Sequence, residues 1–166
     1  MKNNFKKCIL KEYPSKIDTK NNIQVLCFFI KQNKFDHSYC ATNEVGMDKS
    51  QLIDYCLSKQ GGYLDFPFAG DDYAVIKIKN DKNGKYRIFA EIFLLSGRDC
   101  LTFSADEETA FGLRIQFADY ITKGYHCPPV QAKYKSTAPI EFFDDDMLKS
   151  FVDLSYDYAK RKLKID

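Results

Sequence analysis

The chain has 166 residues, of which 45% are hydrophobic and 15% aromatic, and its formal net charge is +2. This apolar fraction is enough to build a packed core, which excludes a globally disordered chain. The net charge is too small to indicate a nucleic-acid or membrane partner by itself. No stretch approaches the roughly 20 apolar residues that a membrane-spanning helix needs, so we expect no membrane association.

Cysteine usage indicates the compartment. The six cysteines include no C-x-x-C pair, and no secretory signal precedes the short apolar run at residues 23–30. We therefore expect a cytoplasmic protein with reduced thiols, in which Cys56 and Cys100 are small core residues.

The first 46 residues differ in composition from the rest. They hold 8 Lys and 4 Asp or Glu, a net charge of +4, while residues 47–166 carry a net charge of −2. We interpret residues 1–46 as an N-terminal extension, in part disordered, or as a small subdomain, and residues 47–166 as the main domain. One hypothesis makes Met47 the natural start. Its rival has the apolar run at residues 23–30 dock onto the main domain.

The main domain opens with a short amphipathic helix. Over residues 50–59, apolar side chains repeat at i,i+4 in "LIDYCL". Gly61 and Gly62 are typical of a helix C-terminus. The next segment, "YLDFPF" at residues 63–68, is expected to be extended because Pro67 disfavours a helical residue before it.

A β-hairpin is predicted next. "AVIKIK" at residues 74–79 has the alternation of a strand. The turn at residues 80–85 contains Asn83 and Gly84, residue types that accept a positive φ. These features indicate an antiparallel pair with the following strand.

The second strand of this hairpin covers residues 86–95, "YRIFAEIFLL". Strict alternation would place Arg87, Phe89 and Glu91 on one face. A third strand is predicted at residues 100–104, which completes a β-meander.

Helix and strand signals continue after the meander. Ser104 and Glu107 have the spacing of a capping box and predict a helix over about residues 105–117. Residues 131–136 are predicted as a fourth strand, and residues 137–143 as an extended lead-in to a final helix.

The final helix is predicted to start near Asp144. The acids Asp144–Asp146 suit its N-terminus, and Lys160–Lys162 complement its C-terminus. A divalent-cation site at the three acids is the alternative, but consecutive helical residues point in different directions. The order of elements indicates an α+β fold, an antiparallel sheet with helices packed on one face.

Residues 47–163 resemble the YjbR/MmcQ family, small bacterial proteins described as DNA-binding. The resemblance rests on "LIDYCLSKQGG" before "YLDFPF", on "GLRIQF" before "ITKGYH", and on "LKSFVDLSYDYAKRKL". It departs after His126, where "CPP" replaces the family's Asn-Lys step. The resemblance implies a frataxin-like two-layer sandwich and a DNA-binding role. The residues that match family motifs are Pro67, Phe68, Arg114, Tyr125, His126, Ser155 and Tyr156.

Cations on the predicted hairpin and on the segment after residue 120 are the candidate DNA-binding residues. A two-stranded ribbon of this kind can enter a groove or grip phosphates. Tyr125 and Tyr134 would stack on exposed bases. The alternative is a solvated sheet face whose lysines discourage edge pairing. The candidates are Lys77, Lys79, Lys82, Lys85, Arg87, Lys123, Lys133 and Lys135.

The His126–Cys127 pair has three interpretations. A catalytic pair is disfavoured because neighbours in an extended chain point apart. A zinc site would need His37 and Cys40 from the other part of the chain. We favour a structural role, in which Tyr125 and His126 anchor a loop end and two prolines stiffen its exit. No metal or cofactor is expected.

The favoured function is that of a non-enzymatic, monomeric protein that binds DNA through the basic hairpin. The first alternative is a protein-interaction or small-ligand-binding module on the same fold. It would use the aromatic side chains of Tyr63, Phe66 and Phe68, and it requires them to be exposed or to line a pocket. The second alternative is an enzyme or metalloprotein without a recognisable motif.

Overall fold

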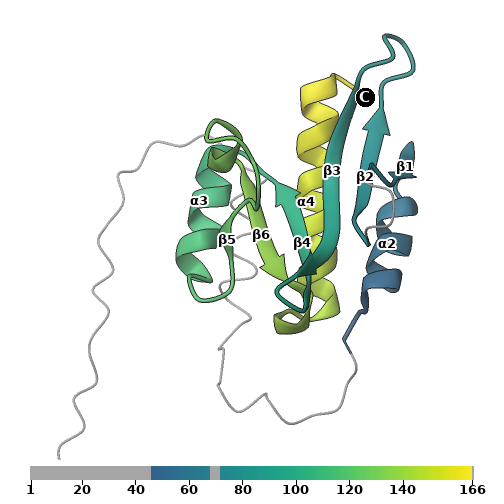
Figure 1. Cartoon of the computed structure of the whole chain (residues 1–166). Coiled ribbons are helices and arrows are strands. Elements are labelled where there is room, and N and C mark those ends of the chain that lie inside the picture. Colours follow the sequence, from purple (N-terminus) through teal and green to yellow (C-terminus); the bar gives the residue numbers. More distant parts are fainter. Residues whose placement is uncertain (1–45, 68–71, 166) are drawn as a thin grey trace, which may run out of the picture. The chain divides into compact units, whose positions relative to one another are not determined.

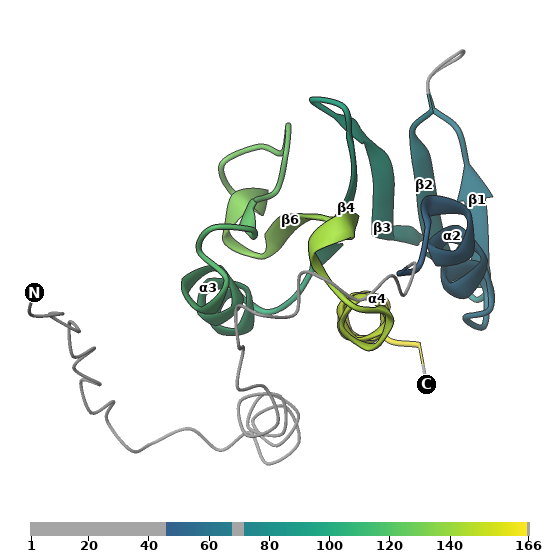
Figure 2. The same cartoon turned by 90° about the horizontal axis from the view of Figure 1, so that it is seen from below.

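The computed structural model describes residues 46–67 and 72–165. These residues form a two-layer α+β fold, in which one six-stranded antiparallel sheet carries helices on one face (Figure 1, Figure 2). The predicted fold class is confirmed. The predicted N-terminal extension, with His37, Cys40 and the run at residues 23–30, lies outside the described residues, so its interpretation stays a prediction.

The sheet has the strand order β1-β2-β3-β4-β6-β5, with β3 and β4 at its centre. The first four strands are neighbours in sequence order, as the predicted meander requires. The strands are β1 (Gly62–Asp65), β2 (Ala74–Lys79), β3 (Tyr86–Leu95), β4 (Arg98–Ser104), β5 (Thr122–Lys123) and β6 (Lys135–Pro139). The first part of the segment predicted to be extended after the first helix, residues 63–65, therefore belongs to an edge strand.

Within the described residues, three α-helices cover one face of the sheet, and each begins with an aspartate cap. The side chains of Asp48, Asp106 and Asp144 each accept a hydrogen bond from a backbone N–H in the first helical turn. The capping role predicted for Asp144 is confirmed. The helices are α2 (Lys49–Leu57), α3 (Glu107–Gln116) and α4 (Asp145–Leu163), and two 3₁₀ turns are η1 (Gln131–Lys133) and η2 (Ile140–Phe142).

The core lies between α4 and the central strands. Phe103 of β4 stacks on Phe151 of α4, with 4.6 Å between ring centroids and 2° between planes. Ile92, Leu101 and Val152 are fully buried beside them. Burial of each such side chain stabilises the fold by about 1.5–3 kcal/mol. The sheet face away from the helices is called the open face below.

The capping box predicted at Ser104 and Glu107 is wrong. Ser104 is the last residue of β4, and its buried N–H donates to Ser155 Oγ at 2.7 Å. The helix begins at Glu107 instead, where Asp106 accepts from the Thr109 N–H at 3.0 Å. The strand continues through Ser104 because its partner β6 extends as far, so the aspartate two residues later becomes the cap.

The strand predicted at residues 131–136 is also wrong. The Gln131 and Ala132 N–H groups both donate to the Pro128 carbonyl, so the chain turns here and forms η1. The strand begins only at Lys135 and takes in the first part of the predicted lead-in. The remainder of that lead-in is the turn η2.

The β2–β3 pairing contains a β-bulge that the sequence does not reveal. The register shifts between Ile76 and Lys77, which leaves Phe89 of β3 without a partner residue on β2. The Phe89 ring is buried against Tyr156 of α4, at 5.4 Å between centroids. Its carbonyl accepts a 2.5 Å hydrogen bond from Ser155 Oγ, so α4 holds the bulge in place.

The bulge decides which face Arg87 occupies. Arg87 is opposite the buried Ile78 and therefore lies on the helix side of the sheet. Glu91 is opposite Val75 and lies on the open face, since its neighbour Ala90 faces the helices. The predicted alternation, which placed Arg87 and Glu91 on the same face, is wrong because the extra residue inverts it.

Candidate nucleic-acid interface

The β2–β3 turn is a compact, hydrogen-bonded structure. The Asn80 N–H donates to the Lys85 carbonyl, and the Asn80 carbonyl accepts from the Gly84 N–H, each at 2.8 Å. The Asn80 side chain also accepts from the Lys82 N–H at 2.9 Å. Gly84 has a φ of 70°, as the turn motif predicted. The turn therefore holds its lysines on a defined backbone.

Three hairpin lysines are exposed and have no ion-pair partner among the described residues. They are Lys79, Lys82 and Lys85. Figure 1 shows the turn that carries two of them projecting beyond the neighbouring strands. Unpaired exposed cations are those that can neutralise a ligand without first breaking a contact.

Lys77 differs from these three. Its ammonium forms an ion pair with Asp65 on β1, and it lies 4.9 Å from the centroid of the Tyr86 ring. The hydrogen bond to Asp65 raises the pKa of Lys77. This lysine joins the edge strand to the hairpin on the open face, so its charge is already compensated.

Arg87 belongs to a different group of cations. Because of the bulge it lies toward α4, where it approaches Tyr158 together with Arg161. Burial raises the pKa of Tyr158, and the positive charges of Arg87 and Arg161 act against that rise. Lys162 lies over the same ring, 5.3 Å from its centroid. Two elements therefore bring three cations around one tyrosine.

Of the predicted DNA-binding cations outside the hairpin, one is exposed at the sheet edge and two lie beside carboxylates. Lys123 is exposed on β5, the far edge of the sheet. Lys133 lies 3.6 Å from a Glu107 oxygen, and Lys135 forms a 2.8 Å ion pair with Glu91 on the open face. The described structure thus provides no continuous line of unpaired cations from the hairpin to this region.

The loop that contains His126 and Cys127 closes on itself. The Cys127 thiol donates to the Gly124 carbonyl at 3.0 Å, and the Tyr125 N–H donates to Thr137 Oγ1 at 2.9 Å. The His126 ring lies edge-on to Tyr125, 4.0 Å away, and its φ of 50° is left-handed. The side chains of His126 and Cys127 therefore interact with different neighbours rather than with each other, and this geometry supports a structural role for the pair.

An aromatic row crosses the open face beside this loop. Phe93 is stacked by Tyr73 on one side, at 4.8 Å, and by Tyr125 on the other, at 5.5 Å. Burial and the neighbouring Glu91 carboxylate raise the pKa of Tyr73. Tyr125 remains 40% exposed, so the row covers Phe93 while presenting one ring to solvent.

The family-motif residues in α3 and α4 make structural contacts. Arg114 donates to the carbonyls of Lys133 and Lys135 and so fixes α3 to β6. Ser155 joins α4 to the two central strands, and Tyr156 donates to the Gln60 carbonyl at 2.8 Å. Two further motif positions are less informative: Pro67 is exposed, and Phe68 lies outside the described residues.

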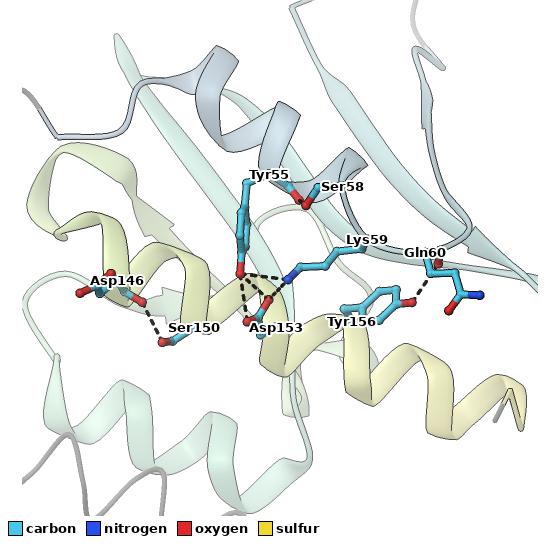
Figure 3. A network of polar contacts seen from close by, with 8 residues as sticks. All are labelled: Tyr55, Ser58, Lys59, Gln60, Asp146, Ser150, Asp153 and Tyr156. Carbon is cyan, nitrogen blue, oxygen red and sulfur yellow. Dashed lines mark hydrogen bonds and ion pairs between the residues drawn. The ribbon is translucent and has the colours of Figure 1, made fainter.

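A polar network ties α2 to α4 (Figure 3). Tyr55 donates to Asp153 at 2.9 Å and accepts from Lys59 at 2.9 Å, and Lys59 lies 2.5 Å from the same carboxylate. Burial lowers the pKa of Lys59, but its hydrogen bonds to Asp153 and Tyr55 outweigh this and raise it. The three groups satisfy one another, which is typical of a structural contact.

The described residues contain no group of three His, Cys, Asp or Glu side chains arranged to hold a metal ion. Within the predicted acidic triplet, Asp144 caps α4 and Asp145 accepts from the Met47 N–H at 2.6 Å. Cys56 and Cys100 are buried core residues, as predicted, and burial raises the pKa of both thiols. No helix in the described ranges is long and apolar enough to span a membrane.

Sequence reasoning missed one part of this surface. Lys160, Arg161 and Lys162 were interpreted only as partners of the helix dipole, and Lys164 was given no role. In the structure they lie beside the hairpin, because Asn80 donates to the Leu163 carbonyl at 2.9 Å. The sequence signal for this part of the surface was the dense basic run "KRKLK". The hairpin beside it in the structure is about 80 residues earlier in the sequence.

Comparison with solved structures shows where this fold occurs elsewhere. The protein DR2400 from Deinococcus radiodurans, a DUF419 domain, aligns with a TM-score of 0.56 and 20% identity, covering 70% of this chain and 88% of that one. A Pseudomonas syringae protein, structural genomics target PsR293, aligns with a TM-score of 0.53 and 20% identity, covering 68% and 99%. No family model and no curated protein matches the sequence. The chain therefore has a fold similar to that of a DUF419-domain protein.

Proposed function

We propose that this chain is a non-enzymatic, YjbR/MmcQ-like protein of the cytoplasm that binds DNA as a monomer through its β2–β3 hairpin. The sequence resemblance over residues 47–163 supports this proposal, and the two-layer fold agrees with it. The observation that carries it is the set of three exposed lysines, Lys79, Lys82 and Lys85, that have no acidic partner among the described residues.

The physical reason is the release of counterions. DNA carries a condensed layer of cations, and each lysine that neutralises a phosphate releases part of that layer. A lysine already paired with a carboxylate, such as Lys77 or Lys135, contributes less to DNA affinity because its charge is compensated before binding. The three unpaired hairpin lysines therefore provide most of the hairpin's affinity, and this affinity falls as salt rises.

A titration of labelled duplex tests the proposal. Fluorescence anisotropy of a 20-base-pair DNA is measured against protein at 50–200 mM KCl for wild type and for Lys79→Gln/Lys82→Gln/Lys85→Gln. Each lost phosphate contact lowers the salt slope by about 0.9, so the triple variant is expected to lower it by about 2.7. Its affinity at 50 mM salt is expected to fall on the order of 100-fold.

The matched control replaces three cations away from the hairpin with glutamine, at Lys49, Arg98 and Lys149, with the same change in net charge. It is expected to bind almost as well as wild type. An equal loss in the control would show that overall charge, rather than the hairpin, determines binding. If wild type fails to bind duplex DNA at 50 mM salt, the DNA-binding proposal is wrong.

A second candidate function rests on the aromatic edge of β1. Tyr63 is 37% exposed and Phe66 is 56% exposed, so both rings present apolar surface to solvent. A protein-interaction or small-ligand module would use these rings. Phe66→Ser is expected to abolish capture of such a partner and to leave DNA binding unchanged, which separates the two candidates.

A further inference from the structure

Positive charge is concentrated on two segments that are distant in sequence. Residues 79–87 and 156–165 together hold eight Lys or Arg and two Asp, a net charge of +6, whereas the whole chain carries +2. None of these eight cations forms an ion pair with another described residue. Residues 47–166 together carry −2, so the remainder of this domain is net negative and the two segments form its cationic pole.

The two segments are fixed to each other. The Asn80 side chain is 7% exposed and donates to the carbonyl of Leu163, the last residue of α4. The Asn80 backbone also organises the hairpin turn. One buried side chain thus links the base of the turn to the end of the helix, so both sets of cations are held in place before any ligand arrives.

Two shallow hollows flank this junction, and each is lined from both segments. The larger, of about 480 Å³, has Lys85 and Arg87 from the hairpin and Lys162 from α4 in its wall. The smaller, of about 100 Å³, has Lys79 from β2 and Lys160 from α4. Asp81 is the acid that lines the smaller hollow. Each hollow therefore pairs hairpin cations with a helix cation.

The ring of Tyr158 shows how close these groups lie. Lys162 is 5.3 Å from its centroid, and Arg87 and Arg161 are near enough to affect its ionisation. Like charges so close together repel one another when no anion is present. An arrangement of this kind is stabilised by a ligand that presents several negative charges along a line.

We propose that the C-terminal end of α4 and the β2–β3 hairpin form one binding surface for the phosphodiester backbone of duplex DNA, with Lys160 and Lys162 as phosphate contacts. This inference rests on the proposed function and adds a second element to its site. Duplex DNA fits because it carries one negative charge per about 1.7 Å of axis, enough to contact both segments at once. The contacts to phosphate are independent of sequence.

The test compares two double variants in the same anisotropy titration of a 20-base-pair duplex. Lys160→Gln/Lys162→Gln removes one cation from each hollow, and Arg98→Gln/Lys149→Gln removes the same charge elsewhere. The first is expected to lower the salt slope by about 1.8 and the affinity at 50 mM KCl by on the order of tenfold or more. The second is expected to change affinity less than about twofold. Far-UV circular dichroism of both variants confirms that they are folded.

The outcomes separate this inference from the proposed function. If wild type binds and the two double variants bind equally well, the role of α4 is wrong and the hairpin proposal stands. If wild type does not bind the duplex at all, the proposed function is wrong and this inference falls with it. Tighter binding to an RNA duplex of the same sequence would overturn the assignment to DNA.

Discussion

The substitution Ser155→Ala removes the hydroxyl that joins α4 to the two central strands. Ser155 is fully buried, and its Oγ donates to the Phe89 carbonyl at 2.5 Å and accepts from the Ser104 N–H at 2.7 Å. The Phe89 carbonyl belongs to the bulge, where the strand ladder is disrupted. Both backbone groups would therefore lose a partner in a place that solvent does not reach.

The magnitude follows from the two groups left unsatisfied. A buried donor or acceptor without its partner costs about 1–3 kcal/mol. Alanine leaves almost no cavity, so the polar groups dominate, and the free energy of unfolding is expected to fall by about 2–5 kcal/mol. For a domain of this size, the melting temperature is expected to fall by about 10 °C.

Urea denaturation followed by circular dichroism measures this effect. The control is Ser150→Ala on the same helix, because Ser150 Oγ donates to the Asp146 carbonyl at an exposed position. That control is expected to change stability by less than about 0.5 kcal/mol. If Ser155→Ala lies within about 0.5 kcal/mol of Ser150→Ala, the reasoning about the two buried groups is refuted.

Four further predictions concern other parts of the structure. Gly124→Ala is expected to destabilise the domain by about 1–3 kcal/mol in the same urea assay, because the new Cβ would lie 2.6 Å from a β6 side chain. Gly112→Ala, inside α3 with open space around it, is expected to stabilise it by about 0.5–1 kcal/mol. Asp153→Asn is expected to cost about 0.5–1 kcal/mol at pH 7. The raised pKa of Lys59 means that this contribution is present at neutral pH and disappears as pH rises above about 10.5. Burial raises the pKa of Cys56 to about 12, so iodoacetamide at pH 8 is expected to leave this thiol unmodified until urea unfolds the chain, as peptide mapping would show.

Each of these has an outcome that contradicts it. Equal stability of the Gly124→Ala and Gly112→Ala variants would mean that the loop yields to the added methyl group. A cost for Asp153→Asn that persists unchanged at pH 11.5 would exclude the charged lysine as its source. Labelling of Cys56 at the same rate as the half-buried Cys127 would show that the core around α2 opens readily.

The strands and helices with a regular pattern could be predicted from the sequence. The apolar alternation of β2 and the i,i+4 repeats of α2 depend on local periodicity, which the fold preserves. The aspartates before α4 also acted locally, and Asp144 is its cap. The predicted aromatic edge at Tyr63 and Phe66 is exposed, although its use stays a prediction.

The errors occur where a distant contact overrides a local signal. Ser104 has the spacing of a cap, but its N–H is taken by Ser155, a residue 51 positions away. The face of Arg87 depends on a bulge whose carbonyl is satisfied by α4, and nothing within β3 indicates an extra residue. The cationic pole was missed for the same reason, since Asn80 and Leu163 meet only in the folded chain.

The bulge at Phe89 also has a consequence for the electrostatic field of the protein. A bulge increases the right-handed twist of the strands that leave it. The outer half of the hairpin, which carries the turn lysines, is therefore rotated relative to the inner half. Deleting Phe89 would keep every cation in the sequence and leave Arg87 opposite Ile78 on the helix side, but it would remove the bulge and its extra twist, so the turn lysines would point in another direction. The bulge, together with the number of lysines, therefore sets the direction from which a polyanion approaches the hairpin.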